Sequence, residues 1–325
     1  MGKLTKTLCA ILALGVLMTG GMSGTASAAY PDKPVTIIIP FGPGGAVDIA
    51  ARIIAEYMQA KHNITFNIVC KGGGGGAPAM LDVASARPDG YTFGFPALAT
   101  FSTTPQVKKT GYTIDDFQAV VQITSMWLSL AVNTDFPAKD IKGLMEEAKK
   151  NPGKVNFATH GALSTQRLFM YSIMKKFPGV DLPHVAYTSG HEVSTALLGH
   201  HITCAFGVTT NHKPYVESGN FRIIGVSSPE RLAEFPDAPT MAEQLGPEFV
   251  FPSAHGLIAP KKVKKDRVIA MQNLIKEALE DPGVKEKFAK AGLTTDYLPA
   301  DEFQKSMEKM WKLFGDTLRE NNLIK

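Results

Sequence analysis

The sequence predicts an α/β protein of about two domains, built on a mostly parallel sheet with helices on both faces. Three observations predict this class. Short apolar runs rich in β-branched residues alternate with longer segments of helical periodicity from residue 35 onward. Glycine-rich turns join the first of these runs to the segments that come after them. The composition over 325 residues, 44% hydrophobic and 20% charged, is that of a globular chain.

The first strand and the first helix show the pattern most clearly. Residues 35–40 form an apolar, β-branched run without alternation, which is typical of a strand buried on both faces. In residues 46–59, apolar side chains recur at spacings of three and four, at Val47, Ala50 and Ile54. This spacing predicts a helix with one buried face.

The later elements obey the same rule. Further strands are expected at residues 64–70, 91–95, 155–159, 184–187, 202–206 and 222–226. Further helices are expected at residues 77–86, 140–150, 164–176, 266–280, 283–290 and 300–321, with short helices between the strands of the middle part.

Two glycine-rich turns, residues 41–45 and 72–76, come directly after the first two strands. Ligands of open α/β sheets bind at the carboxyl ends of the strands. A turn without side chains that leads into a helix exposes unpaired N–H groups and the positive end of the helix dipole, which together suit a carboxylate, phosphate or sulfate. The alternative is that the glycines only permit tight turns. Asp48 in the first helical turn would repel an anion, so we interpret it as mainly structural.

Nucleotide-binding motifs fit the chain less well than a simple anion site. Gly72, Gly74 and Ala77 match a dinucleotide fingerprint, but no acidic residue ends a following strand at the required distance. The phosphate-binding loop motif GxxxxGK[ST] does not occur in the sequence. We therefore expect no cofactor.

The sequence contains no motif of a metal site or of a catalytic centre. Five histidines lie between His184 and His212, without the spacing of a metal-binding motif. His191 and His200 are either hydrogen-bond donors in a cleft or solvated loop residues. No nucleophile elbow occurs, so we expect no catalytic residues and no metal. An exported hydrolase remains the alternative from a different class.

The first 28 residues are typical of a cleaved secretory signal peptide. Two lysines precede an apolar core, and Ala26 and Ala28 suggest cleavage after residue 28 or 29. Removal of Lys3 and Lys6 lowers the formal net charge from +4 to +2, which predicts no nucleic-acid partner. A membrane anchor is the alternative, although no later segment is long and apolar enough to span a membrane. Cys70 and Cys204 would remain, and we interpret them as two buried thiols rather than a disulfide.

Several motifs, taken in order, resemble one family. Residues 30–34 (Tyr-Pro-Asp-Lys-Pro) and 40–48 (Pro-Phe-Gly-Pro-Gly-Gly-Ala-Val-Asp) are similar to the opening of the Bug or TctC proteins. These are extracytoplasmic solute receptors of tripartite tricarboxylate transporters. Further similar segments are residues 88–92, 151–153, 184–187, 196–199, 236–243 and 256–260.

The resemblance implies a type II periplasmic-binding-protein fold, with two α/β lobes, a hinge and an interlobe cleft. Lobe 1 would comprise residues 30–124 plus 253–325, and lobe 2 residues 125–252. It further implies a periplasmic, monomeric binding protein without catalytic activity. Its ligand would be a di-, tri- or aromatic carboxylate, and its partners would be membrane transporter subunits. A sensory receptor for a membrane signalling partner is a variant that the sequence does not separate from transport.

The expected ligand-binding residues combine the glycine turns with positions similar to the family's motifs. They are Phe41, Gly44, Gly45, Gly73, Gly74, Gly75, Gly76, Thr100 of the third loop, Thr159, Gly161, Ser164 and Ser189. The chain departs from the family pattern at three positions: Ala77 replaces an Asn, Arg167 a His and Thr203 an Asp. Trp127 and Phe101 are either core residues or cleft residues that would favour an aromatic carboxylate.

Overall fold

The computed structural model describes residues 30–161, 164–187, 189–321 and 324, without the side chains of residues 99–101. The expected signal peptide lies outside the described residues. Residues 33–325 form one unit, which contains all the elements of the fold. None of the described helices is both long enough and apolar enough to cross a bilayer.

The first group of elements is built on three parallel strands. They are β1 (Val35–Ile39), β2 (Phe66–Cys70) and β3 (Thr92–Gly94), with β1 between the other two. Helices α2 (Ala46–His62) and α3 (Ala77–Ala84) connect them. The continuous apolar run of β1 is explained by this central position, because Ile37 pairs with Ile68 on one side and with Phe93 on the other.

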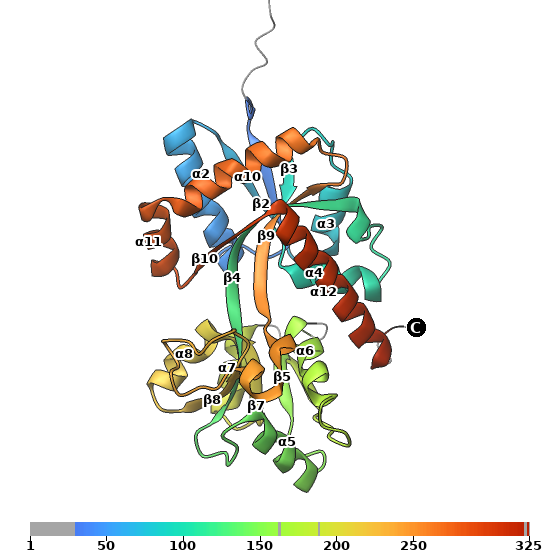
Figure 1. The fold of residues 1–325 in the computed structure, drawn as a ribbon, viewed down its shortest axis with the longest axis vertical. Helices are drawn as coiled ribbons and strands as arrows, with labels where there is room; N and C mark the ends of the chain where they lie inside the picture. Colours follow the sequence, from blue (N-terminus) through green and yellow to red (C-terminus); the bar gives the residue numbers. More distant parts are fainter. Residues whose placement is uncertain (1–29, 162–163, 188, 322–323, 325) are drawn as a thin grey trace, which may run out of the picture. The chain divides into compact units, whose positions relative to one another are not determined.

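Two long antiparallel strands connect this group to a second one (Figure 1). They are β4 (Phe117–Asn133) and β9 (Pro252–Pro260). The first part of β4 pairs with β9 and with β10 (Thr295–Pro299), and its last part pairs with β7 (Cys204–Val208) and β8 (Phe221–Val226). The expected lobe boundaries fall inside β4 and at the first residues of β9, and the division into lobes stays a prediction.

The second group contains the parallel strands β5 (Phe157–His160), β6 (His184–Tyr187) and β7. Its helices are α5 (Ile141–Lys150), α6 (Thr165–Met174), α7 (Gly190–Leu198), α8 (Thr209–Glu217) and α9 (Met241–Leu245). Four strand pairs of the described chain are parallel and five are antiparallel, so the expectation of a mostly parallel sheet is wrong. The antiparallel pairs all involve β4 or β9, which were not predicted as strands.

The strands and helices that were expected are present, with ends within three residues of those predicted. The expectation of a third loop around Thr100 is wrong, because the helix α4 (Leu98–Val107) lies there. This helix contains Ser102, Thr103, Thr104 and Pro105, which are poor helix formers, so propensity did not reveal it. Thr100 therefore lies in a helix, and its side chain, like that of Phe101, is outside the described part.

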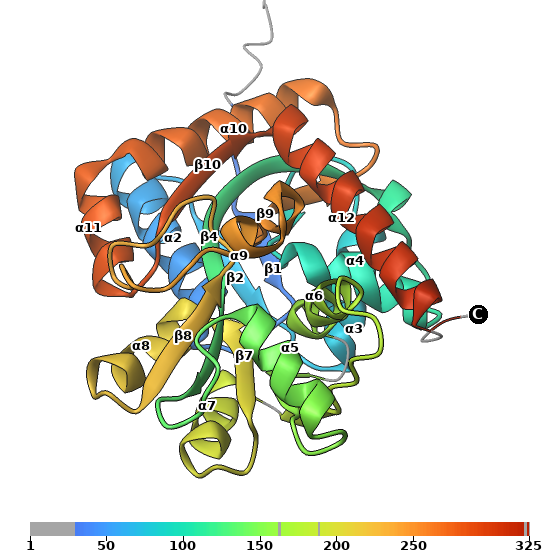
Figure 2. The same ribbon diagram turned by 60° about the horizontal axis from the view of Figure 1, so that its bottom comes forward.

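The C-terminal helices cover the first group. They are α10 (Lys265–Glu280), α11 (Pro282–Lys290) and α12 (Ala300–Glu320). In α12 the buried side chains Phe303, Met307, Met310, Phe314 and Leu318 recur at helical spacing. Figure 2 shows α12 beside α4, and the two helices are in contact. This packing holds α4, whose N-cap residue, Ala97, lines a large pocket.

Candidate ligand-binding site

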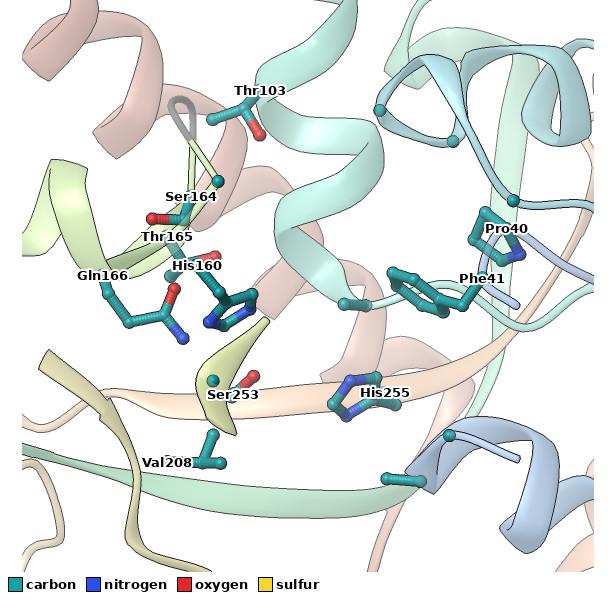
Figure 3. Close-up of a pocket in the computed structure, with 18 of the residues that line it drawn as sticks. Pro40, Phe41, Thr103, His160, Ser164, Thr165, Gln166, Val208, Ser253 and His255 are labelled. Atoms are coloured by element: carbon teal, nitrogen blue, oxygen red, sulfur yellow. The ribbon is translucent and has the colours of Figure 1, made fainter. Parts of the chain in front are cut away.

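A pocket of about 810 Å³ lies among the glycine turns, α4, α6, α8 and β9 (Figure 3). Its walls come from both groups of elements. Phe41 and Gly45 lie after β1, Gly161 and Ser164 lie after β5, and His255 belongs to β9. The pocket therefore brings together turns that are more than a hundred residues apart in the sequence.

The N-terminal ends of helices converge on this pocket. The N-cap residues of five helices line it: Gly45 of α2, Gly76 of α3, Ala97 of α4, Ser164 of α6 and Val208 of α8. Four of them, all except Ser164, provide no side-chain cap. The first N–H groups of a helix have no partner within the helix and carry about half a positive charge in total. The pocket is therefore surrounded by main-chain donors.

The first glycine turn is held by Asp48, which is 3% exposed. Its carboxylate accepts hydrogen bonds from the Gly44 N–H at 2.8 Å and from the Cys70 thiol at 3.3 Å, and it pairs with Arg52 Nε at 2.9 Å. Burial raises the pKa of Asp48, but the bonds from Arg52, Gly44 and Cys70 outweigh burial and lower it. Gly44 thus gives its N–H to Asp48 and does not line the pocket.

Both cysteines that would remain after signal cleavage are free thiols. Cys204 is fully buried, as expected. Cys70 is only partly buried, so the expectation of two buried thiols is wrong for this residue. The reason is its position at the end of β2, an edge strand, just before the second glycine turn.

The second glycine turn contains four consecutive residues with positive φ, which lies between 59° at Gly74 and 96° at Gly73. Only glycine adopts such a run without strain. Gly76 donates its N–H to the Gly73 carbonyl at 2.9 Å, and the Thr104 hydroxyl donates to the Gly75 carbonyl at 2.9 Å. Gly73, Gly75 and Gly76 line the pocket, whereas Gly74 does not.

On the opposite side, Thr159 shapes the turn between β5 and α6. It is fully buried, and its hydroxyl lies 2.8 Å from His184 Nε2 and donates to the Gly161 carbonyl at 3.1 Å. The Ser164 hydroxyl donates to the Thr159 oxygen at 2.8 Å. Gly161 and Ser164 consequently line the pocket, while Thr159 supports them from behind.

Ser189 acts in a similar way at α7. Its hydroxyl accepts the Glu192 N–H at 3.2 Å and caps the helix, and it does not line the pocket. The next residue, Gly190, does line it, and a Cβ there would overlap Asn211 Nδ2. The absence of a side chain at Gly190 therefore allows the Asn211 amide to reach the pocket wall.

Several lining residues were not predicted from the sequence. They are Lys108, Thr103, Gln166, Asn211, Ser253 and the two histidines His160 and His255. His160 comes directly after Thr159, in a turn that the sequence did predict, so its position was the available signal. His255 was missed because β9 was not expected as a strand. Figure 3 shows His160, Gln166, Ser253 and His255 at the pocket, with Phe41 on its other side.

Burial favours the neutral form of the two histidines. Burial lowers the pKa of His255 to about 4, although a hydrogen bond with the Ser253 backbone raises it. Burial also lowers the pKa of His160. The Nδ1 atom of each ring is buried without a hydrogen-bond partner in the described part of the chain. Among the described lining residues, Lys108 is the one Lys, Arg, Asp or Glu, and its side chain is exposed.

Other residues considered from the sequence lie away from the pocket. Trp127 is half-buried on β4, and the Arg167 guanidinium donates to the Tyr171 hydroxyl at 2.9 Å. His191 and His200 do not line the pocket. Within the described ranges, no group of three or more His, Cys, Asp or Glu side chains is placed to hold a metal.

An α/β fold of two strand groups connected by long strands, with this pocket among helix N-termini, defines a periplasmic-type solute-binding protein. A solved protein described as a periplasmic transporter has the same fold, with 31% identity and a TM-score of 0.76 over 91% of this chain and 99% of that chain. The tripartite tricarboxylate transporter family receptor model, TctC, matches residues 50–323, and the chain belongs to this family. It is a family of solute-binding receptors and not of enzymes.

Similar proteins extend the comparison. BugT of Bordetella pertussis is 28% identical over 86% of each chain. Two solved structures share the fold at lower identity. An R. palustris protein with adipate has 23% identity and a TM-score of 0.74 over 89% of this chain and 97% of that chain. MatC from Rhodopseudomonas palustris with bound malate has 24% identity and a TM-score of 0.71 over 89% of this chain and 100% of that chain. The family match begins at residue 50, just after the first glycine turn.

Proposed function

We propose that this protein captures a small carboxylate in the periplasm, after export by a cleaved signal peptide, and presents it to the membrane subunits of a tripartite tricarboxylate-type transporter. The observation that carries the proposal is the convergence of five helix N-cap residues on one pocket, four of them without a side-chain cap.

The electrostatics of the pocket favour an anion. A helix N-terminus stabilises a nearby negative charge by about 0.3–1 kcal/mol at an exposed site, and by up to about 2 kcal/mol when partly buried. The described lining includes no Asp or Glu to oppose this field, because Asp48 is turned toward Gly44, Cys70 and Arg52. Main-chain N–H donors would hold a carboxylate here without an arginine.

The ligand class rests on size and on family membership. A pocket of about 810 Å³ accommodates di-, tri- and aromatic carboxylates. Fold relatives solved with adipate and with malate indicate that dicarboxylates should be tested first. We propose that the expected residues that line this pocket contact the ligand through main-chain N–H groups or side chains. They are Phe41, Gly45, Gly73, Gly75, Gly76, Gly161 and Ser164.

We further propose that binding closes the pocket by a hinge within β4 and β9. These strands connect the two groups of elements, and each carries lining residues: Met126 on β4, and Ser253 and His255 on β9. Hinge closure around a ligand is a common motion of two-lobe binding proteins. The closed, liganded form would be the one that the membrane subunits recognise.

A thermal-shift screen tests the ligand class. The purified protein, stripped of ligand by unfolding and refolding, is heated with mono-, di-, tri- and aromatic carboxylates, with phosphate and sulfate as competing anions. Binding at a hundredfold excess over Kd stabilises the folded state by about 2.7 kcal/mol, so a true ligand raises the melting temperature by several degrees. Stabilisation by phosphate or sulfate alone, with no response to any carboxylate, would contradict the proposal.

A further inference from the structure

We propose that His160 and His255, together termed the histidine pair, form a neutral hydrogen-bonding subsite for a ligand hydroxyl group. The protein would then prefer hydroxycarboxylates over carboxylates that lack the hydroxyl. The inference rests on the carboxylate-binding function proposed above and specifies the ligand class within it.

The histidine pair is built from two separate parts of the chain. His160 is the last residue of β5 and directly precedes Gly161. His255 lies in β9, where it pairs with Thr124 of β4 and forms a bridge with Ala97, the N-cap residue of α4. Both rings line the same pocket (Figure 3). A ligand in contact with both rings would therefore join the two groups of elements.

The histidine pair carries unused hydrogen-bonding capacity. His255 is 5% exposed, and its Nδ1 atom has no partner among the described residues; the same is true of the buried Nδ1 atom of His160. Buried polar atoms in folded proteins are nearly always paired, because leaving one unpaired costs free energy. Both rings line one pocket, so a rotation of each ring would turn its buried Nδ1 atom toward a ligand that provides the partner.

The hydrogen-bonding groups of the histidine pair suit a ligand hydroxyl group. A neutral imidazole presents one donor and one acceptor, as a hydroxyl does, whereas a carboxylate only accepts. Burial lowers the pKa of both histidines, which favours neutral rings. The side chains of Gln166 and Ser253, which also line this pocket, are neutral as well. Helix N-termini would thus bind the carboxylates of the ligand, and the histidine pair would form hydrogen bonds with its uncharged hydroxyl group.

Matched ligand pairs that differ by one hydroxyl test the inference. Calorimetric Kd values would be compared for succinate and malate, glutarate and 2-hydroxyglutarate, propanoate and lactate, and tricarballylate and citrate. We expect the hydroxylated member of the pair that binds best to bind at least tenfold more tightly. Equal Kd values within every pair that binds would overturn the inference and leave carboxylate capture intact. If no member of any pair binds although another carboxylate of the screen does, the inference fails and carboxylate capture stands. If no carboxylate binds at all, both fail.

Substitutions assign the selectivity to the histidine pair. In His160→Leu and His255→Leu, the ratio of the two Kd values should fall toward one, because the Kd of the hydroxylated ligand rises more than that of the ligand without the hydroxyl. His255→Asn, which retains a neutral donor and acceptor, should restore part of the ratio, and it also serves if His255→Leu fails to fold. His191→Leu, outside the pocket, is the matched control. An unchanged ratio in His160→Leu and in both His255 variants would overturn the assignment.

The pH dependence separates a hydroxyl from a carboxylate on the histidine pair. The titratable side chains of the described lining are His160, His255 and Lys108. A bound carboxylate would raise the pKa of the imidazoles, so affinity would increase as the pH falls from 8 to 6 and protons would be taken up on binding. We expect instead a constant ratio of Kd values over this range and no proton uptake in buffers of different ionisation enthalpy. Proton uptake that disappears in His255→Asn would overturn the inference.

Discussion

Asp48 accepts the main-chain N–H of Gly44 at 2.8 Å, four residues before it, and so ties the first glycine turn to the first turn of α2. The same carboxylate receives the Cys70 thiol from the end of β2 and the Arg52 guanidinium from the next turn of the helix. One nearly buried side chain therefore joins two strand ends and a helix start. The turn that leads into the pocket has a fixed shape because of this side chain rather than because of its glycines alone.

Asp48→Asn should destabilise the fold without filling the pocket. The change removes the charge that three donors share, and hydrogen bonds to a charged group contribute about 1.5–3 kcal/mol, so we expect a loss of about 1–3 kcal/mol in unfolding free energy at pH 7. Urea unfolding measures it. The exposed Asp316, which pairs with Lys312 and Arg319, provides the control, since solvent screens these charges and Asp316→Asn should have a much smaller effect.

The pH dependence of the Asp48 effect has a defined sign. The pKa of Asp48 is lowered in the folded state, so its stabilising contribution is present above the unfolded value of about 4 and is lost as the pH falls through the folded value. The difference between the wild type and Asp48→Asn should therefore be constant from pH 8 to 5 and shrink below about pH 4. A difference that grows toward low pH would contradict this account.

Gly45→Val should weaken carboxylate binding while leaving the fold intact. The backbone of Gly45 is extended, with φ of −79°, and a Cβ would meet only the Gly42 carbonyl oxygen, at 3.7 Å. A branched side chain would, however, stand between the ligand and the first N–H groups of α2. We expect Kd to rise at least tenfold, measured by calorimetry with the best ligand of the screen.

The control for Gly45→Val is Lys264→Val. Lys264 is the N-cap residue of α10, has a similar extended backbone with φ of −63°, provides no side-chain cap and lies outside the pocket. It should leave Kd unchanged. Equal affinities in both variants would mean that the main chain of the first turn does not contact the ligand.

The sequence predicted the glycine turns and the start of α6 at the pocket because strand-to-helix turns are local features. Gly45, Gly75 and Gly161 line the pocket as expected, and their contacts with a ligand stay predictions. Thr159 and Ser189 are placed behind it, since their hydroxyls are used to hold the turns that expose Gly161 and Gly190. A hydroxyl at a helix start can face the pocket or the backbone of its own turn, and only the packing of the fold determines which of the two it faces.

The histidine pair and α4 could not be predicted from the sequence, for physical reasons. His255 comes to the pocket through the pairing of β9 with β4, a contact between segments about 130 residues apart. Helix α4 is held by tertiary contacts with α12 and not by its own Ser, Thr and Pro residues. Such non-local contacts leave no periodic pattern that a single sequence displays.

Gly190→Ala should change ligand binding through Asn211. The new Cβ would overlap Asn211 Nδ2, and because the obstacle is the end of a flexible side chain, the amide can move away at small cost to stability. We expect the melting temperature to change by less than about 2 °C, while Kd for the best carboxylate rises. Asn211→Ala provides the comparison: if Gly190→Ala acts by displacing this amide, the two effects on Kd should not add.

Gly256→Ala should be severely destabilising, because the added Cβ would overlap the Val121 carbonyl oxygen and lie 2.6 Å from the ring of Phe303. Relief requires that β9 move away from β4 or that α12 lift from the sheet, and overpacking of a core costs about 1–3 kcal/mol or more. Urea unfolding should show a loss at the upper end of this range or no folded protein. Gly42→Ala, where nothing lies within 4 Å of the new Cβ, is the control.

A second substitution tests which contact dominates at Gly256. Phe303→Leu removes the ring but leaves the Val121 carbonyl in place, so Gly256→Ala should cost less in the Phe303→Leu background than in the wild type, yet still more than Gly42→Ala. Complete rescue would show that α12 alone limits the space. Because Gly256 adjoins His255, the stable double variant should also bind carboxylates more weakly than Phe303→Leu does, which would connect the packing of β9 to the pocket.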